Sequence, residues 1–319
     1  MILHVALGVG AGLVSAFLFG AASAGSPLGV VLMYLSPLPI LIVALGWHQL
    51  LGLLALCVGA IAISLALKSS AALAFALGPG LSAWLPAYLA LLSRPAPASN
   101  DNGAERWFPV GHLLFWLAAT SAFIACAAVL ATAGGDIERY QAALEKAASD
   151  MLNRPGRSGA PDLPIPARDF AALMVYLTPA MLGSAMTVIL SLNLWLGAKA
   201  VALSGRLIRP WPDIPSLRMP ITAALAFAAG IVLAGSGGIG GMIAMALVGA
   251  FGAAFALQGL AAIHDLTRGR NSRGLELGLL YCLLAIAGLF VAPLLALLGL
   301  VDTLFPIPGR RSRRPSSSP

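Results

Sequence analysis

Charged residues are scarce along this chain, and none occurs before Lys68. Only 10% of the 319 residues are Asp, Glu, Lys or Arg, whereas 59% are hydrophobic and the mean hydropathy is +0.91. A soluble domain usually carries about a quarter charged residues. A chain this apolar cannot bury its hydrophobic surface in a single core, so the composition predicts a protein embedded in lipid.

The apolar runs also lack the alternation of polar and apolar residues that membrane β-barrel strands show over about ten positions. Only helices and closed barrels satisfy their backbone hydrogen bonds in lipid, so these runs predict helices. A hydrocarbon layer about 30 Å thick needs about 20 helical residues per crossing. We therefore predict an all-α fold: a polytopic transmembrane helical bundle of eight or nine spans in the inner (plasma) membrane, surrounded by the lipid bilayer.

The predicted spans form one transmembrane domain over residues 1–303. They cover residues 3–23, 28–46, 49–67, 71–92, 108–133, 171–197, 219–235, 238–263 and 275–300. Prolines within or beside them predict kinks, because proline removes a backbone hydrogen bond. At Gly78-Pro79-Gly80 we favour a kink over a re-entrant break in the fourth span.

Cysteine is nearly absent, which limits disulfide and metal chemistry. Cys57, Cys126 and Cys282 all lie inside apolar runs. An odd number of scattered cysteines gives neither a disulfide framework nor the spacing of metal ligands. We interpret them as small hydrophobic residues that pack between helices, and we predict no metal site and no cofactor.

Asp and Glu are missing from the interior of every predicted span, since Glu276 and Asp302 lie at the ends of the last one. Proton- and sodium-coupled transporters place ionisable groups at membrane depth, so a carboxylate relay is not expected. The chain also lacks a His-Glu-x-x-His motif, a Walker phosphate loop and a dinucleotide fingerprint. We predict no catalytic residue and no enzyme, although sequence alone leaves a membrane serine protease open.

Glycine-rich motifs predict close packing. Gly8-x-x-x-Gly12 and Gly237-x-x-x-Gly241 both fit the spacing that lets two membrane helices approach closely. The run of residues 235–241 superficially looks like a phosphate cradle, but it lacks the Lys-Ser/Thr ending. We interpret it as a tight hairpin between two spans.

Two segments outside the spans are polar. In residues 134–170, apolar side chains such as Tyr140 and Leu144 recur at helical spacing, which predicts an amphipathic helix over 136–152 capped by Asp136. This helix either lies on the bilayer or bundle surface, which we favour, or docks a protein partner. The tail, residues 304–319, contains four arginines and predicts a disordered segment attracted to anionic headgroups.

The net charge of +7 comes from basic residues in the loops and the tail. Membrane proteins place such residues on the cytoplasmic side, and aromatic residues do not alternate with them as in nucleic-acid-binding proteins, so we predict no nucleic-acid partner. The rule places the loops that hold Arg94, Arg106 and Lys199 in the cytoplasm. Nine full crossings would put the arginine-rich tail outside, unless the last span folds at Ala292-Pro293 into a re-entrant hairpin.

Few polar side chains remain within or beside the spans. The candidate ligand-binding residues are Asn193, Gln258, Tyr176, Tyr34 and His48. Asn193 and Gln258 attract most interest, because a buried amide needs hydrogen-bond partners. These amides either line a polar cavity or join helices to one another, and His48 is expected at a turn at the membrane interface. The sequence does not define an oligomeric state.

Several motifs together resemble the YybS-like family of uncharacterised bacterial polytopic membrane proteins. They are Ser36-Pro37-Leu38-Pro39-Ile40, Gly46-Trp47-His48, Gln258-Gly259-Leu260, Pro293 and Leu298-Gly299-Leu300-Val301-Asp302. The resemblance extends over nearly the whole chain and implies a helical membrane domain of unknown function. It implies no catalytic residue, because that family has no established activity.

More distantly, the architecture is similar to the substrate-binding membrane subunits of energy-coupling-factor vitamin importers. That likeness implies that the protein binds a small molecule and leaves energy coupling to separate ATPase and scaffold proteins. The leading hypothesis is thus a small-molecule-binding or transport-related membrane subunit without its own energy coupling. The alternative is a structural or assembly protein of the cell envelope that acts through protein partners.

Overall fold

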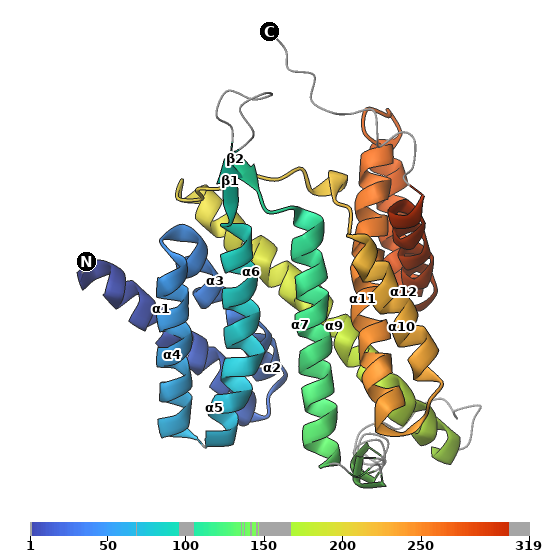
Figure 1. Ribbon diagram of the computed structural model, residues 1–319, viewed down its shortest axis with the longest axis horizontal. Helices are drawn as coiled ribbons and strands as arrows, with labels where there is room; N and C mark the ends of the chain where they lie inside the picture. The colour runs from blue at the N-terminus through green and yellow to red at the C-terminus, as the bar shows by residue number, and fades with distance from the viewer. Residues whose placement is uncertain are drawn as a thin grey trace. The chain divides into compact units, whose positions relative to one another are not determined.

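Helices make up almost all the regular structure of the computed structural model (Figure 1), as the all-α prediction requires. It describes residues 2–67, 69–95, 105–134, 136, 138–140, 142–144, 146 and 167–305. Within this part of the chain, eight helical stretches are long and apolar enough to cross a membrane, and a ninth apolar helix, Ile221–Ala234, is shorter. The predicted class and the estimate of eight or nine spans are confirmed.

The chain divides into two compact units by its internal contacts. Unit 1 consists of Met1–Leu117, Val188–Met219 and Ala261–Asp265, and unit 2 consists of Ala118–Thr187, Pro220–Leu260 and Leu266–Pro319. The predicted single domain over residues 1–303 remains a prediction.

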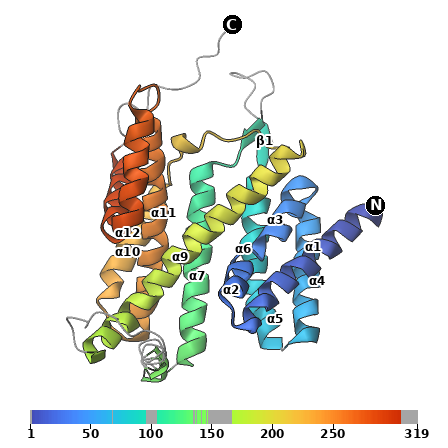
Figure 2. The ribbon, with the colours of Figure 1, turned by 180° about the vertical axis from the view of Figure 1, so that it is seen from behind.

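Unit 1 contains most of the short helices, together with the only two strands in the part of the chain that the structure describes. Its elements are α1 (Ile2–Gly20), α2 (Pro27–Tyr34), α3 (Pro37–Gly46), α4 (Gln49–Ala66), α5 (Ser69–Phe75), α6 (Leu81–Ala90), β1 (Ser93–Pro95), β2 (Glu105–Trp107), and parts of α7 (Val110–Ala133), α9 (Ala167–Leu203) and α11. Figure 2 shows these elements from behind.

Glycine allows α1 to contact α4 closely. A Cβ atom at Gly12 would collide with the carbonyl of Ala55, and one at Gly8 would lie 3.0 Å from Leu54 Cδ2. The predicted Gly8-x-x-x-Gly12 packing face is therefore confirmed. A core of buried side chains from α1, α3, α4, α5 and α6, including Ile40 and Phe75, surrounds this contact.

Two of the predicted spans in unit 1 are interrupted. Residues 28–46 form two helices, α2 and α3, because Pro37 and Pro39 have no N–H group to continue the helical pattern. In the fourth span a π-helical stretch, Ala76–Gly80, joins α5 to α6 around Pro79. The chain stays helical through this stretch, so the predicted kink is confirmed over the re-entrant break.

Unit 2 contains the remaining parts of α7 and α9, together with α10 (Ile221–Ala234), α11 (Gly238–Leu266) and α12 (Arg273–Leu304). Small residues let α9 and α11 pack closely. A Cβ atom at Gly249 would collide with the carbonyl of Ala180, while the hydroxyls of Ser184 and Thr187 donate to carbonyls of α11 at 2.9 and 3.2 Å.

The hairpin between α10 and α11 is a tight turn, as predicted. Gly237 and Gly238 have φ angles of +70° and +58°, a left-handed conformation that side chains other than glycine rarely adopt. Gly237 therefore belongs to the turn, and the predicted helical packing motif Gly237-x-x-x-Gly241 is wrong.

Helix α12 bends back on α11. Its one non-helical residue is Ala287, with φ −126° and ψ 33°. If α12 were straight, Asp302 would lie about 44 Å from Arg273 at 1.5 Å per residue, whereas Gln258 lies only about 12 Å from the end of α11. Because Gln258 and Asp302 are hydrogen-bonded, the chain must bend between them. The bend lies at Ala287, five residues before Ala292-Pro293, where a fold of the last span was one of the two alternatives.

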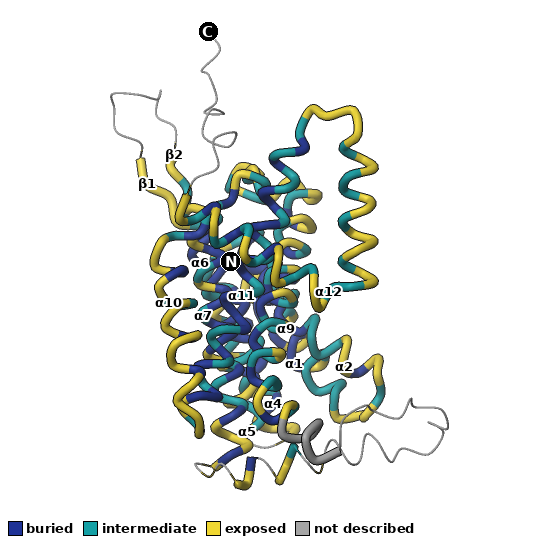
Figure 3. The backbone as a smooth tube through the Cα atoms, turned by 90° about the vertical axis from the view of Figure 1, so that its right-hand side faces the viewer, coloured by how far each residue is buried: buried dark blue, intermediate teal, exposed yellow. Residues whose placement is uncertain are grey.

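Much of α12 is exposed (Figure 3). Its exposed side chains are apolar and large, among them Leu275, Ile286 and Leu289, each with about four-fifths of its surface accessible (79%, 80% and 83%). An apolar face of this extent matches lipid rather than water.

Candidate functional site

The amide of Asn193 stabilises the break between α2 and α3. In a continuous helix the N–H of Leu38 would donate to the carbonyl of Tyr34, but it donates to Leu35 at 3.0 Å instead. Asn193 Nδ2 donates to the Tyr34 carbonyl at 2.9 Å and also to Ile189 in its own helix at 2.9 Å. We call Asn193 and residues 34–36 the Asn193 junction.

Serines complete the same junction. The hydroxyl of Ser15, fully buried in α1, donates to the carbonyl of Ser36. Asn193 Oδ1 and the hydroxyl of Ser36 are buried and have no hydrogen-bond partner in the structure. The junction contains no carboxylate and no basic side chain among its members, and its hydrogen bonds go to backbone carbonyls. Its chemistry is that of helix joining, which is one of the two roles predicted for Asn193.

The remaining candidates in unit 1 are not gathered around Asn193 by their side chains. Tyr34 is half-buried, and its backbone carbonyl rather than its ring contacts Asn193. His48 is exposed at the start of α4, where its Nδ1 accepts from the N–H of Leu50 at 3.2 Å. His48 thus caps a helix at a turn between spans, as expected for an interfacial histidine. A ligand-binding role for either residue remains a prediction.

In unit 2, Gln258 lies at the centre of a cluster of polar groups. Its Nε2 is 3.0 Å from each of three acceptors, namely the Gly299 carbonyl, Asp302 Oδ2 and Thr303 Oγ1. The Thr303 hydroxyl lies 3.2 Å from Gln258 Oε1. We call Gln258, Gly299, Asp302 and Thr303 the Gln258 cluster; Gln258 is 0% exposed and Asp302 1% exposed.

Glycines bring the two helices of this cluster into backbone contact. A Cβ atom at Gly259 would collide with the carbonyl of Leu295, and one at Gly299 would collide with the carbonyl of Phe255. Each helix therefore contributes one glycine to the crossing. This close approach places the side chain of Gln258 within hydrogen-bond distance of the last turn of α12.

Asp302 lies in the final turn of α12, which ends at Leu304 rather than at the predicted residue 300, so it marks the end of the last span as expected. Its side chain is nevertheless buried, with 1% of its surface exposed, so this helix end places a carboxyl group within the packed part of unit 2. Two sequence signals could have indicated the contact between α11 and α12. Gly259 directly follows the amide of Gln258, and Gly299 lies three residues before the carboxylate of Asp302.

Tyr176, the fifth candidate, is far less buried than Gln258, with 41% of its surface exposed. Its hydroxyl donates to the carbonyl of Ala234 at 3.0 Å. Ala234 is the last residue of α10, so this bond satisfies a carbonyl that the helix end leaves without an intrahelical partner. The structure assigns Tyr176 a joining contact, and its ligand-binding role remains a prediction.

The described part of the predicted helix 136–152 packs within unit 2. Residues 138–140, 142–144 and 146 are helical, and Asp136 caps them by accepting from the N–H of Glu138 at 2.9 Å. Tyr140 is buried against Val129, Val175 and neighbouring residues. Burial raises the pKa of Tyr140 above its usual value, because the phenolate is poorly solvated there. The rest of the predicted helix lies outside the described residues, as does the tail from 306 onward.

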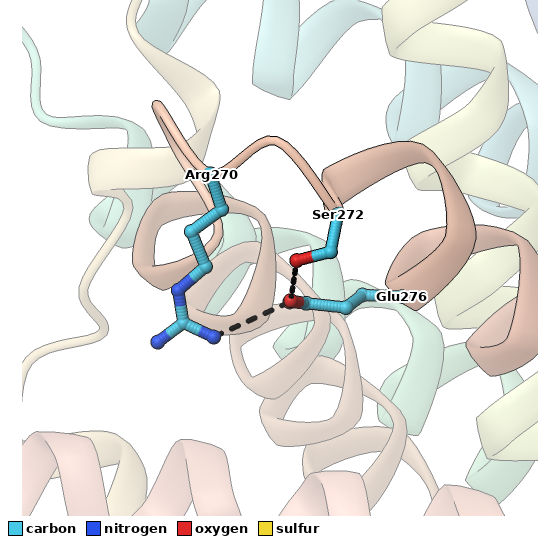
Figure 4. A network of polar contacts seen from close by, with 3 residues as sticks. All are labelled: Arg270, Ser272 and Glu276. Carbon is cyan, nitrogen blue, oxygen red and sulfur yellow. Dashed lines mark hydrogen bonds and ion pairs between the residues drawn. The ribbon is translucent and has the colours of Figure 1, made fainter.

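The turn between α11 and α12 carries an exposed polar network (Figure 4). Arg270 forms an ion pair with Glu276 at 3.3 Å, and the hydroxyl of Ser272 donates to the same carboxylate at 2.6 Å. Exposed pairs of this kind contribute little to stability. The network is a surface feature that closes the turn.

Within the residues that the structure describes, no group of three or more His, Cys, Asp or Glu side chains could hold a metal ion. The acceptors of the Gln258 cluster are a carboxylate, a hydroxyl and a carbonyl. Such groups bind hydrogen-bond donors and positively charged groups.

Comparison with known proteins gives one match. A family model described as a predicted membrane protein (DUF2232) covers residues 13–303, which include both the Asn193 junction and the Gln258 cluster. No curated protein and no solved structure matches the chain.

Proposed function

The chain belongs to the DUF2232 family of predicted membrane proteins, and we propose that it is a small-molecule-binding or transport-related membrane subunit. In this proposal it resides in the inner (plasma) membrane, has no enzymatic activity, and binds its ligand at the Gln258 cluster. The observation that carries the proposal is the buried carboxylate of Asp302 beside the amide of Gln258.

A buried carboxylate costs free energy, because an ion loses its hydration in an apolar environment. Ionisable residues within membrane bundles are therefore rare, and they mark ligand or ion pathways by default. In an almost uncharged bundle, Asp302 stands out as the acidic side chain with the least exposed surface among those described, at 1%.

The cluster favours a ligand that donates hydrogen bonds or carries a positive charge. Three acceptors surround one amide nitrogen that has only two hydrogens. A ligand with an amino, amidine or hydroxyl group would complement the carboxylate, carbonyl and hydroxyl oxygens of the cluster.

Interrupted helices also support a binding role. The break at Ala287 interrupts a long apolar helix of the same unit as the Gln258 cluster. Discontinuous helices of this kind form substrate sites in several transporter folds. The sequence has no Walker phosphate loop, so in this proposal energy for any transport comes from partner proteins, as it does in energy-coupling-factor importers.

A thermal-shift experiment in detergent tests the proposal with a small-molecule extract of the producing cells as the probe. The extract should raise the melting temperature of the wild-type protein and of Asn193→Leu, and should leave Thr303→Val unchanged. Thr303→Val removes one polar group of the cluster at nearly constant volume, so the variant should still fold. If Thr303→Val and Gln258→Leu respond to the extract as the wild type does, the site assignment is wrong.

A further inference from the structure

Two arginines face each other on the hairpin of unit 1. β1 and β2 pair antiparallel, and Arg94 lies directly opposite Arg106 in the register. Residues directly opposite in an antiparallel pair project their side chains to the same face, and like charges at such positions repel. Both arginines are exposed, and neither forms an ion pair with a residue that the structure describes. Glu105 of β2 is adjacent to Arg106 and therefore projects to the opposite face of the hairpin, since side chains alternate along a strand. The face with the two arginines thus presents two positive charges.

A third arginine lies at the base of this hairpin. Arg209 Nη1 donates to the carbonyl of Ala90, the last residue of α6, at 3.2 Å. That contact places the segment after α9 beside the hairpin, as Figures 1 and 2 also show. Burial lowers the pKa of Arg209 from its usual value, but an arginine remains charged at neutral pH.

Aromatic side chains at the same end of unit 1 indicate how deep in the membrane the arginines of the hairpin lie. Lys199 lies 5.0 Å from the ring of Trp211, and Arg206 lies 4.8 Å from the ring of Trp47. Trp107 ends β2, next to the first residues of α7. Tryptophan concentrates at the boundary between hydrocarbon and headgroups, so these rings indicate headgroup depth at the base of the hairpin.

The distance along the chain agrees with that depth. Arg94 comes four residues after the end of α6, and Arg106 comes four residues before the start of α7. An extended chain of four residues spans about 13 Å at most, and arginine side chains reach back toward the headgroups. Both guanidinium groups therefore lie within reach of lipid phosphates.

We propose that Arg94 and Arg106 form a site for the phosphate of an anionic lipid headgroup, with Arg209 beside it. Two guanidinium groups on one face offer paired N–H donors that match the oxygens of a phosphate. The bound phosphate removes the repulsion between the two arginines. This site is independent of the Gln258 cluster and of any small-molecule ligand.

The test is lipid retention in nanodiscs made of equal parts phosphatidylglycerol and phosphatidylcholine. The wild-type protein should carry excess phosphatidylglycerol in native mass spectrometry. Replacing both arginines, Arg94→Gln and Arg106→Gln, should reduce this preference by about fivefold per arginine, since each basic residue near the surface contributes about that factor. Both side chains are exposed, so the variant should keep the wild-type melting temperature.

Arg270→Gln is the matched control, because Arg270 is an exposed arginine that already has a carboxylate partner in Glu276. It should keep the wild-type lipid preference. Added inorganic phosphate should not displace the lipid, because acyl chains hold the lipid phosphate at the surface. An unchanged preference in the double variant, an equal loss in Arg270→Gln, or displacement by inorganic phosphate would each overturn the proposal.

Discussion

The two buried amides of the bundle differ in what surrounds them. Asn193, in unit 1, donates to two backbone carbonyls, one of which a proline break leaves without its helical donor. Gln258, in unit 2, meets a carboxylate and a hydroxyl as well as a carbonyl. Both amides satisfy buried polar groups, but of the two only Gln258 is hydrogen-bonded to a carboxyl group. In the proposed function, the comparison therefore distinguishes a residue that joins helices from one that contributes to a ligand site.

The largest effect is expected where the helices of the Gln258 cluster cross. Gly259→Leu would force a side chain into the carbonyl of Leu295, so it should cost about 3 kcal/mol or more and prevent unit 2 from folding normally. Expression yield and thermal unfolding in detergent measure this. Gly278→Leu is the control, because a Cβ atom at Gly278 meets nothing within 4 Å. Equal damage from both variants would contradict the packing argument.

Gln258→Leu should have the next largest effect, because it removes a partner of the buried Asp302 carboxylate. We expect a loss of about 2–3 kcal/mol in the free energy of unfolding. The double variant Gln258→Leu with Asp302→Leu should regain part of the loss, since replacing both partners leaves no buried charge. A strictly additive double-mutant cycle would show that the two side chains do not interact.

Asn193→Leu should cost less, about 1–2 kcal/mol, because it removes a donor from backbone carbonyls rather than from a buried carboxyl group. The loss should appear in the unfolding of unit 1 and should not alter ligand retention. Hydrogen exchange at residues 34–38 offers a direct measurement, since the α2–α3 break should open more often. A loss of retained ligand in this variant would contradict the distinction between the two amides.

The smallest effect is expected at the surface turn. Arg270→Gln removes an ion pair whose side chains are 58% and 33% exposed, so stability should change by less than about 0.5 kcal/mol. Chemical denaturation of the purified variant measures this. A change as large as that of Asn193→Leu would show that the turn contributes to the fold.

Hydropathy, chain length and glycine spacing were sufficient to predict the helical class, the number of spans and a close helix contact at Gly8 and Gly12, but not that the partner is α4. They did not reveal that residues 28–46 form two helices, because a proline does not specify whether its helix kinks or ends. The sequence left open whether the last span folds at Ala292-Pro293, and the bend of α12 lies at Ala287, beside Gly288.

The sequence identified both amides as residues that need partners, but not what those partners would be. Gln258 and Asp302 are 44 positions apart, and their contact depends on the bend of α12 and on two glycines in different helices. The helix end at Leu304 rather than 300 decides that Asp302 is inside the bundle. These are tertiary features, which helical periodicity within one segment does not encode.

Native mass spectrometry of the gently solubilised protein tests the central claim most directly. The account predicts that the wild type and Asn193→Leu retain the same small molecule, alone or with ATPase and scaffold subunits, and that Gln258→Leu and Thr303→Val lose it. Wild-type protein that carries only lipid and envelope proteins would contradict the account and favour a structural or assembly role. Retention by all the variants would contradict the placement of the site at Gln258.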